Sequence, residues 1–332
     1  MKPKGTLLLK RKNIVNIIEY DEYITSVEEA FKMYALGQAL SQGILHIDST
    51  DGEFHIKAGG IEVNNKIYFA LKANSGFFKN LERFGLPNIQ GVIVLFDGNT
   101  GFPLAIMDST EITLQRTAAA VSIATKYLAR PDSKIATICG CGNQGRNQLK
   151  ALKHVLPIER VFVFDRDEQK AIRFAADVSS NSENAIDPVQ DLEKAVIQSD
   201  VVVTCTPSKR FFLSKKSVSP GTFISAIGAD SPEKQEIDPQ LLVGNKVVVD
   251  VLDQCAEVGE LHHSLDRGIL TKEDVHGELG AIVAGLISGR TSDEEIIVFD
   301  STGSAVQDVA AAVSVYEKAL SLDRDLLIDF FG

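Results

Sequence analysis

A glycine-rich turn lies in the middle of the 332-residue chain and has the spacing that dinucleotides require. An apolar run ends at Gly140, and Gly142 and Gly145 complete a Gly-x-Gly-x-x-Gly pattern. The first glycine allows a tight turn, the second lets backbone N–H groups approach a pyrophosphate, and the third lets helix and strand pack closely. Asn143 and Gln144 open a helical pattern whose N-terminus favours phosphate. We therefore predict a dinucleotide site, the alternative being a plain strand–turn–helix corner.

An acidic residue at the end of the next strand-like run bears on which dinucleotide binds. Asp165 stands about where a ribose-binding carboxylate belongs. It should bind the 2′-hydroxyl of the adenosine ribose and repel a 2′-phosphate, which favours NAD. Arg166 could instead hold that phosphate, so NADP stays open as the alternative.

Three charged residues stand where charge is unexpected. Lys72 lies in an apolar strand-like run, either at an edge in water or buried against an acidic partner or ligand. Arg116 lies in a helical pattern, where a guanidinium can bind a carboxylate through two hydrogen bonds or form an ordinary ion pair. Asp230 follows an apolar strand, where ligands of open α/β sheets bind, so it could transfer protons. The alternative for Asp230 is a turn or capping role ahead of Pro232.

The histidines and cysteines lack the spacing of a metal site. His262 and His263 are adjacent and would point in different directions, and the other four histidines have no partner pattern. The four cysteines lack disulfide-framework spacing, and we interpret them as reduced thiols. We therefore expect no metal and a cytoplasmic protein.

Composition narrows the class of protein. Hydrophobic content of 44% and charged content of 24% are ordinary for a soluble globular protein, and 332 residues suggest two domains. A formal net charge of −11 argues against nucleic-acid or anionic-membrane partners. No apolar stretch approaches the roughly 20 residues of a membrane span. Residues 1–12 lack the apolar core and cleavage site of a signal peptide.

The first hundred or so residues predict an α+β domain. Ser26 and Glu29 could form a capping box that opens a helix over residues 26–40. Residues 97–101 read Asp-Gly-Asn-Thr-Gly, which is a hairpin signal. The strand-like runs are 53–57, 66–73, 91–96 and 102–107.

The rest of the chain predicts an α/β domain. A helical pattern over 110–128 is followed by alternating strands and helices, which implies parallel strands joined by crossover helices. Asp187 and Pro188 are a good cap and first position for a helix through residue 198. The C-terminal helix carries an apolar stripe that we expect to pack back on the first domain. The expected strands are 135–139, 161–164, 201–204, 222–227, 247–250 and 296–299.

Six segments that recur in order from about residue 50 to 320 carry a family resemblance. They are 85–87, 107–109, 116–120, 140–145, 228–234 and 300–308. On these segments the chain resembles the ornithine cyclodeaminase/mu-crystallin family. The resemblance implies a homodimer whose substrate-binding and dimerisation domain contains residues 1–118 and is completed by the C-terminal helix 305–332. It also implies a Rossmann domain over 119–304. The expected fold class is thus α/β, a Rossmann-type doubly wound parallel sheet plus a discontinuous α+β substrate domain.

The resemblance also implies roles for individual residues. Lys72 and Arg116 would hold the substrate carboxylate, and Asp230 would handle protons or water at the reacting centre, so Lys72 and Asp230 are the catalytic candidates. Lys234 would lie near the nicotinamide. The remaining candidates for cofactor contacts are Thr204, Thr206, Gly228 and Ser304.

The implied activity is hydride transfer between nicotinamide and the Cα of a small L-amino acid or its imine. Δ1-Pyrroline-2-carboxylate or ketimine reduction and alanine dehydrogenation are the examples. One alternative is ornithine cyclodeamination, which yields L-proline and ammonia. A further alternative is a mu-crystallin-like protein that binds NADPH and a small ligand without turnover.

Two departures from the family pattern bear on the substrate. Many members carry an arginine where this chain has residues 43–48, so His46 could replace a substrate-anchoring cation. Residues 54–60 lack the acid that receives the distal amine of ornithine and contain Lys57, so a cationic side chain would be repelled there. Both residues are substrate-binding candidates. Ornithine is therefore disfavoured, although Glu62 lies close enough in sequence to restore that interpretation.

Overall fold

The computed structural model describes residues 5–15, 17–179, 184–322 and 326–330. The chain divides into two compact units. Unit 1 combines Met1–Ala120 with Ser304–Gly332, and unit 2 is Val121–Gly303. Unit 1 is therefore built from two stretches of chain that are far apart in sequence.

Unit 1 is built on a seven-stranded mixed sheet with the order β17-β1-β6-β5-β4-β3-β2. Strands β2 to β6 form an antiparallel meander, β1 pairs parallel with β6, and β17 pairs antiparallel with β1. The predicted hairpin between β5 and β6 is confirmed, because Asp97 Oδ1 accepts hydrogen bonds from the backbone N–H groups of Asn99 and Thr100. The strands are β1 (Thr6–Leu9), β2 (Gly43–Ser49), β3 (Gly52–Val63), β4 (Lys66–Gly76), β5 (Ile89–Asp97), β6 (Pro103–Asp108) and β17 (Leu326–Ile328).

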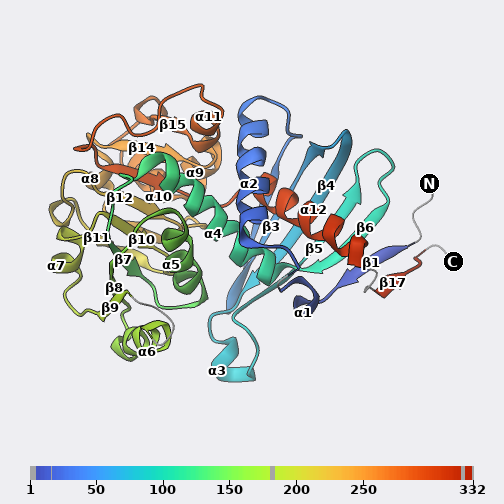
Figure 1. Ribbon diagram of the computed structural model, residues 1–332, viewed down its shortest axis with the longest axis horizontal. Helices are drawn as coiled ribbons and strands as arrows, with labels where there is room; N and C mark the ends of the chain where they lie inside the picture. The colour runs from blue at the N-terminus through green and yellow to red at the C-terminus, as the bar shows by residue number, and fades with distance from the viewer. Residues whose placement is uncertain (1–4, 16, 180–183, 323–325, 331–332) are drawn as a thin grey trace. The chain divides into compact units, whose positions relative to one another are not determined.

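Helices α2 (Tyr20–Ala35) and α12 (Ala305–Leu322) pack against each other, and α12 also packs on β3 and β4 (Figure 1). The predicted start of the first long helix is wrong. Helix α2 begins after Glu19, whose backbone N–H donates to Glu22 Oε2 at 2.7 Å, while Ser26 Oγ donates to Tyr23 O inside the helix. The earlier Glu–Glu pair caps the first turn, so Ser26 is not a cap. The other helices that begin in unit 1 are α1 (Arg11–Ile14), α3 (Asn80–Phe84) and α4 (Ser109–Leu128).

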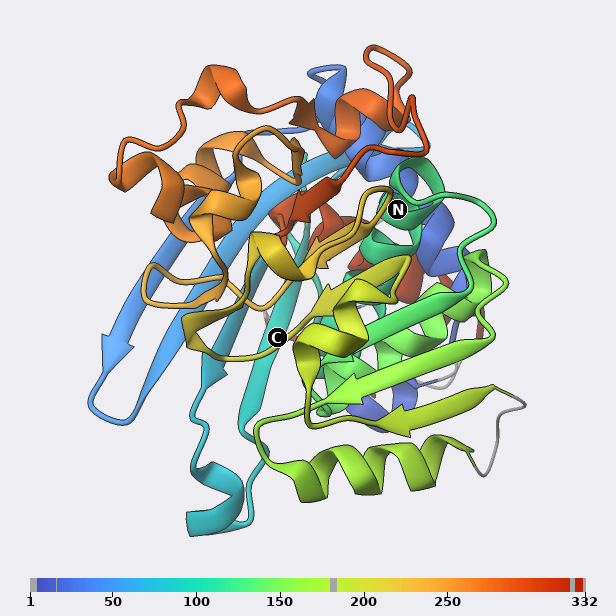
Figure 2. The ribbon, with the colours of Figure 1, turned by 90° about the vertical axis from the view of Figure 1, so that its left-hand side faces the viewer.

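Unit 2 contains an eight-stranded sheet with the order β15-β14-β16-β12-β10-β7-β8-β9. Its paired strands are parallel, and the green arrows of β7, β8 and β9 in Figure 2 point the same way. Strands β8 and β9 extend the sheet on one side of β7, and the chain then returns to β10 on the other side. This reversal puts a topological switch point at the carboxyl ends of β7 and β10, where ligands of such sheets bind. The strands are β7 (Ile135–Cys139), β8 (Arg160–Phe164), β9 (Ala185–Pro188), β10 (Val201–Thr204), β12 (Phe223–Ala226), β14 (Lys246–Val249), β15 (Gly277–Glu278) and β16 (Ile297–Asp300).

The helix predicted to start at Asp187 and Pro188 is wrong at its N-terminus. Pro188 is the last residue of β9, which is an edge strand, where a missing N–H is tolerated. Helix α7 is capped by Asp191, whose Oδ1 accepts from Lys194 N at 3.1 Å. The α-helices of unit 2 are α5 (Asn143–Val155), α6 (Glu168–Ser179), α7 (Leu192–Ile197), α8 (Pro239–Leu242), α9 (Leu252–Val258), α10 (Glu260–Asp266) and α11 (Leu279–Val283). Its 3₁₀-helices are η1 (Lys215–Ser217) and η2 (Lys272–Asp274), and β11 (Lys209–Leu213) pairs with β13 (Gln235–Ile237) in a separate small sheet.

Burial explains the apolar sequence of the central strands. Every residue of β10, β12 and β16 is buried, as expected for parallel strands covered on both faces. Within the described ranges, no helix combines the length and the apolar character needed to cross a membrane.

Candidate active site

The glycine turn connects β7 to α5, and its geometry explains each glycine. Gly140 has a φ of 110°, and a Cβ there would lie 2.8 Å from Cys205 O. A Cβ at Gly145 would lie 2.0 Å from Gly140 O, so helix and turn could not keep this spacing. A Cβ at Gly142 would meet no atom within 4 Å, which leaves the approach to the turn open. The turn is therefore tight and leaves its backbone N–H groups accessible, as pyrophosphate binding requires.

The N-terminus of α5 adds hydrogen-bond donors to this turn. Gly142 occupies the N-cap position and has no side chain that could accept from the first-turn N–H groups. Asn143 and Gln144 are the first two residues of the helix. Their backbone N–H groups belong to the set that an α-helix leaves without intrahelical acceptors, and such groups favour an anion.

Asp165 is tied to the glycine turn. Its Oδ2 accepts from Cys141 N at 3.0 Å, and its Oδ1 accepts from Asp167 N at 2.9 Å. The carboxylate thus lies beside the turn, at the carboxyl end of β8, while Arg166 is exposed. This placement suits a carboxylate that accepts a hydrogen bond from a ribose hydroxyl.

A buried carboxylate that was not predicted from the sequence, Glu236, binds three of the predicted cofactor residues. Glu236 accepts from Thr204 Oγ1 at 2.7 Å, from Thr206 N at 2.6 Å and from Gly228 N at 3.0 Å. Burial raises the pKa of Glu236 to about 7, although the hydrogen bonds from Thr206 and Thr204 act to lower it. Glu236 therefore fixes the loops that follow β10 and β12. Its position in a short buried strand gave no sequence signal.

Asp230 lies after β12 and is paired with Lys234. The Lys234 Nζ lies 2.6 Å from Asp230 Oδ1. The Asp230 side chain is 38% exposed, whereas that of Lys234 is 9% exposed. A carboxylate held by a buried ammonium and open to solvent is suited to exchange a proton with a bound molecule.

In unit 1, Lys72 and Arg116 converge on one buried carboxylate of α12. Lys72 Nζ lies 2.6 Å from Asp308 Oδ2, and Arg116 Nε lies 2.8 Å from Asp308 Oδ1. Arg116 Nη1 also donates to Gln307 Oε1 at 3.0 Å. Asp308 was not predicted as a site residue, although a charge among the apolar residues of α12 is a signal for one.

Lys57 completes this group, which we call the cation cluster (Lys57, Lys72, Arg116 and Asp308). Lys57 is buried and lies opposite Lys72 in the register of β3 and β4. Burial lowers the pKa of Lys72 to about 7, and Asp308 offsets part of that shift. Burial acts to raise the pKa of Asp308, but the three cations hold it below its ordinary value. The group thus has three positive side chains and one negative one, a charge balance that would favour the carboxylate of a ligand.

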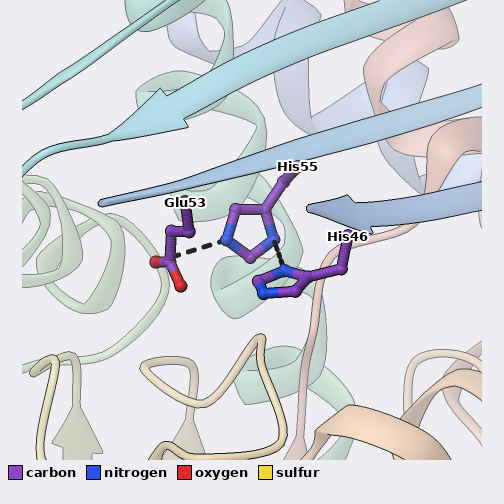
Figure 3. Close-up of side chains that lie close together, drawn as sticks. All are labelled: His46, Glu53 and His55. Atoms are coloured by element: carbon purple, nitrogen blue, oxygen red, sulfur yellow. Dashed lines mark hydrogen bonds and ion pairs between the residues drawn. The ribbon is translucent and has the colours of Figure 1, made fainter. Parts of the chain in front are cut away.

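His46, the other substrate-binding candidate, lies on β2 and contacts different residues. Its Nδ1 lies 3.4 Å from His55 Nδ1 (Figure 3). Its Nε2 lies 3.0 Å from Asp48 Oδ1. In the described part of the chain, no hydrogen bond or ion pair joins His46 to the cation cluster. His55 was not predicted as a partner of His46, because the residue opposite His46 depends on the register of β2 and β3.

Two further candidates lie in unit 1. Ser304 precedes α12, and its buried Oγ has no hydrogen-bond partner among the described residues. Such an orphaned hydroxyl fits a ligand that would supply the partner. Glu62 is exposed and lies on the face of β3 opposite to Lys57, because alternate residues of a strand share a face. Glu62 therefore does not supply an acid beside Lys57.

The chain is similar to known proteins both in sequence and in fold. The model of the ornithine cyclodeaminase/mu-crystallin family matches residues 4–323. An alanine dehydrogenase of Archaeoglobus fulgidus is 41% identical over 326 residues, which are 98% of this chain and 99% of that protein. An archaeal alanine dehydrogenase dimer solved with bound NAD has a TM-score of 0.93 and 40% identity, covering 98% of this chain and 100% of that chain. The Thermococcus litoralis Δ1-pyrroline-2-carboxylate reductase, solved with NADH and L-proline, has a TM-score of 0.91 and 33% identity, covering 97% and 100%.

Proposed function

The chain belongs to the ornithine cyclodeaminase/mu-crystallin family, and we propose on that premise that it is an NAD-dependent oxidoreductase of small amino acids or imines. The observation that carries the proposal is the cation cluster, since a buried group with excess positive charge is suited to a substrate carboxylate. The glycine turn supplies the second requirement, a place for the dinucleotide. When bound, NAD accepts a hydride and NADH donates one.

The residues of unit 2 fit NAD. Gly142 and the N–H groups that open α5 would hold the pyrophosphate, and Asp165 would bind the adenosine ribose. The loops fixed by Glu236 would line the rest of the dinucleotide, with Lys234 toward its nicotinamide end. The two similar structures contain NAD and NADH, which supports NAD. Exposed Arg166 keeps NADP as the alternative.

The residues of unit 1 would hold the substrate. Arg116 and Lys72 would bind its carboxylate, which adds the second negative charge that the cation cluster lacks. Lys57 would repel a cationic side chain, so a small apolar amino acid such as alanine, or a cyclic imine, is favoured. The activities named for the relatives, alanine dehydrogenase and Δ1-pyrroline-2-carboxylate reductase, are of these two types.

Asp230 would move the proton. In oxidation it accepts a proton from the substrate amino group or from attacking water, and in reduction it returns one to nitrogen. Lys234 would hold the Asp230 carboxylate in place through their ion pair. Both residues lie in unit 2.

A second candidate function, ornithine cyclodeamination, is favoured by one observation. Glu53 shares a face of β3 with Lys57, because they are four residues apart in the strand, and it could receive a distal amine. Its contact with His55, 3.3 Å from Glu53 Oε1 to His55 Nε2, competes with that role. Ornithine cyclodeamination therefore ranks second.

We also propose a cytoplasmic homodimer. β2 and α3 expose large apolar side chains, including Leu45, Leu81 and Phe84, which indicates a covered surface. A similar archaeal structure is described as a dimer. All four cysteines are free thiols, as expected in a reducing compartment.

The test is a substrate panel with NADH and NADPH. Pyruvate plus ammonia, Δ1-pyrroline-2-carboxylate and Δ1-piperideine-2-carboxylate are offered for reduction, and alanine and ornithine are offered with NAD⁺ and NADP⁺. A steady change in absorbance at the NADH band supports net oxidation or reduction. Ammonia from ornithine without that change supports cyclodeamination. No turnover with any compound would contradict both and favour a mu-crystallin-like binding protein.

A further inference from the structure

The hairpin of β2 and β3 brings two imidazoles together in an edge-to-face arrangement, with an angle of 70° between the ring planes. His46 lies directly opposite His55 in the register, and their Nδ1 atoms are 3.4 Å apart (Figure 3). The two side chains are largely buried, with 23% and 12% of their surface exposed. Glu53, two residues before His55, belongs to the same group.

Each imidazole turns its other nitrogen toward a carboxylate. His46 Nε2 lies 3.0 Å from Asp48 Oδ1, and His55 Nε2 lies 3.3 Å from Glu53 Oε1. A proton on His46 Nε2 leaves a lone pair on its Nδ1, facing His55. Neutral His55 has one proton for two nitrogens, so it leaves a lone pair facing either His46 or Glu53. A neutral pair thus keeps one repulsive contact, which an added positive charge would remove.

We propose that His46, Glu53 and His55 bind a divalent transition-metal ion such as Zn²⁺. One ligand atom from each of the three residues lies within 4.8 Å of the others. Two nitrogens that bind Zn²⁺ tetrahedrally at its usual bond lengths lie about 3.4 Å apart. The observed Nδ1–Nδ1 distance of 3.4 Å therefore suits two imidazole ligands.

The surroundings match those of metal-binding histidines. A ligating imidazole commonly donates its second N–H to a carboxylate, which fixes the tautomer, and Asp48 is so placed for His46. Glu53 lies on the Nε2 side of His55, so it becomes the third ligand when its carboxylate turns from Nε2 toward the ion; with Asp48 it offsets the charge of a dication. Imidazole and carboxylate ligands suit Zn²⁺, Co²⁺ and Ni²⁺. Three protein ligands leave one tetrahedral position for water or a ligand group.

The site adjoins the cation cluster along β3. Residues 53, 55 and 57 share one face of the strand, because side chains alternate between faces. A metal ion bound by Glu53 and His55 would therefore lie beside Lys57 on that face of β3. The proposal rests on the contacts of the hairpin and stands without the oxidoreductase activity.

The experiment is a calorimetric Zn²⁺ titration of the chain without an affinity tag, after treatment with a chelator. We expect one equivalent per chain in the wild type and none in the double variant His46→Gln/His55→Gln. His276→Gln, which removes an exposed histidine of unit 2, is the matched control and should bind as the wild type does. Co²⁺ should give visible bands without thiolate charge transfer, which excludes the cysteines as ligands.

A milder variant keeps the test valid if the double variant does not fold. Asp48→Asn changes a side chain that is 85% exposed, and it should fold normally. It should weaken Zn²⁺ binding by about 10- to 100-fold, because the outer carboxylate no longer orients His46. Equal uptake by the wild type and the double variant would overturn the proposal. So would a wild type that takes up no metal.

Discussion

Lys72 and Asp308, 236 positions apart in the chain, form an ion pair in which both side chains are almost completely buried, at 3% and 2% exposure. The pair joins β4 to α12, so it ties the two sequence segments of unit 1 together. It also gives Asp308 a role separate from substrate binding, because this residue holds the two cations in place before any ligand arrives.

The first prediction concerns this carboxylate. Asp308→Asn removes the counter-ion of Lys72 and Arg116 and should lower the free energy of unfolding by about 3–5 kcal/mol. Urea denaturation measures the change. Glu29→Gln breaks an exposed pair with Lys32, 3.9 Å apart, and serves as the control with little expected effect. Equal stability of Asp308→Asn and the wild type would show that the buried pair does not hold unit 1 together.

The second prediction follows from the pKa of Lys72, which burial lowers from 10.5 to about 7. Below pH 7 the ammonium is charged and binds a carboxylate, so KM should rise as the pH increases through 7. Because the folded-state pKa is depressed, the contribution of Lys72 to stability is complete above pH 10.5 and lost as the pH falls through 7. Lys72→Arg keeps its charge and should remove the alkaline rise in KM. A rise that persists in Lys72→Arg would assign the effect to another group.

The third prediction concerns Glu236, whose pKa burial raises from 4.5 to about 7. For an acid with a raised folded-state pKa, the stability contribution is complete below pH 4.5 and lost as the pH rises through 7. Glu236→Gln should abolish that pH dependence, which thermal unfolding at several pH values measures. It should also weaken NADH binding, since an amide cannot accept all the hydrogen bonds from Thr204, Thr206 and Gly228. NADH fluorescence reports the binding, and unchanged affinity would separate Glu236 from the cofactor site.

The fourth prediction compares two glycines of one turn. Gly145→Ala places a Cβ 2.0 Å from Gly140 O, so it should lower both the Tm and the affinity for NADH. Gly142→Ala meets no atom within 4 Å and should keep the Tm while weakening NADH binding, because the methyl group obstructs the phosphates. Tight NADH binding by both variants would argue against a dinucleotide at this turn.

The fifth prediction concerns proton transfer. Asp230→Asn removes the proton acceptor and should lower kcat by about 10²- to 10⁴-fold. NADH affinity should change little, because the substitution keeps the size of the side chain. Stopped-flow and fluorescence titration measure the two quantities. Undiminished turnover would remove Asp230 from the mechanism.

Local signals in the sequence predicted local structure well. The hairpin at Asp97 and the turn at Gly140 depend on residues within a few positions of each other, and both are present. The start of α2 was wrong because two possible capping pairs lie within ten residues of each other, and the helix uses the earlier one, Glu19 and Glu22. The start of α7 was wrong because Pro188 ends an edge strand as readily as it begins a helix.

Site residues were predicted where a charge interrupts an apolar pattern, as at Lys72 and Arg116. Their common partner, Asp308, was not, because the contact joins segments that are distant in sequence. Glu236 gave no signal, because its partners lie on loops whose approach depends on the order of the strands in the sheet. The His46–His55 contact needs the exact pairing of β2 and β3, which composition does not specify.

Because unit 1 consists of two chain segments that flank unit 2, it can be completed only after unit 2 has been synthesised. A ribosome completes the whole of Val121–Gly303 before it makes α12, so unit 2 can form while unit 1 still lacks Asp308. Until then the Asp308 carboxylate is not available to neutralise Lys57, Lys72 and Arg116 in the interior of unit 1. Nascent chains of this protein should therefore expose an unfinished sheet to chaperones until translation has passed α12.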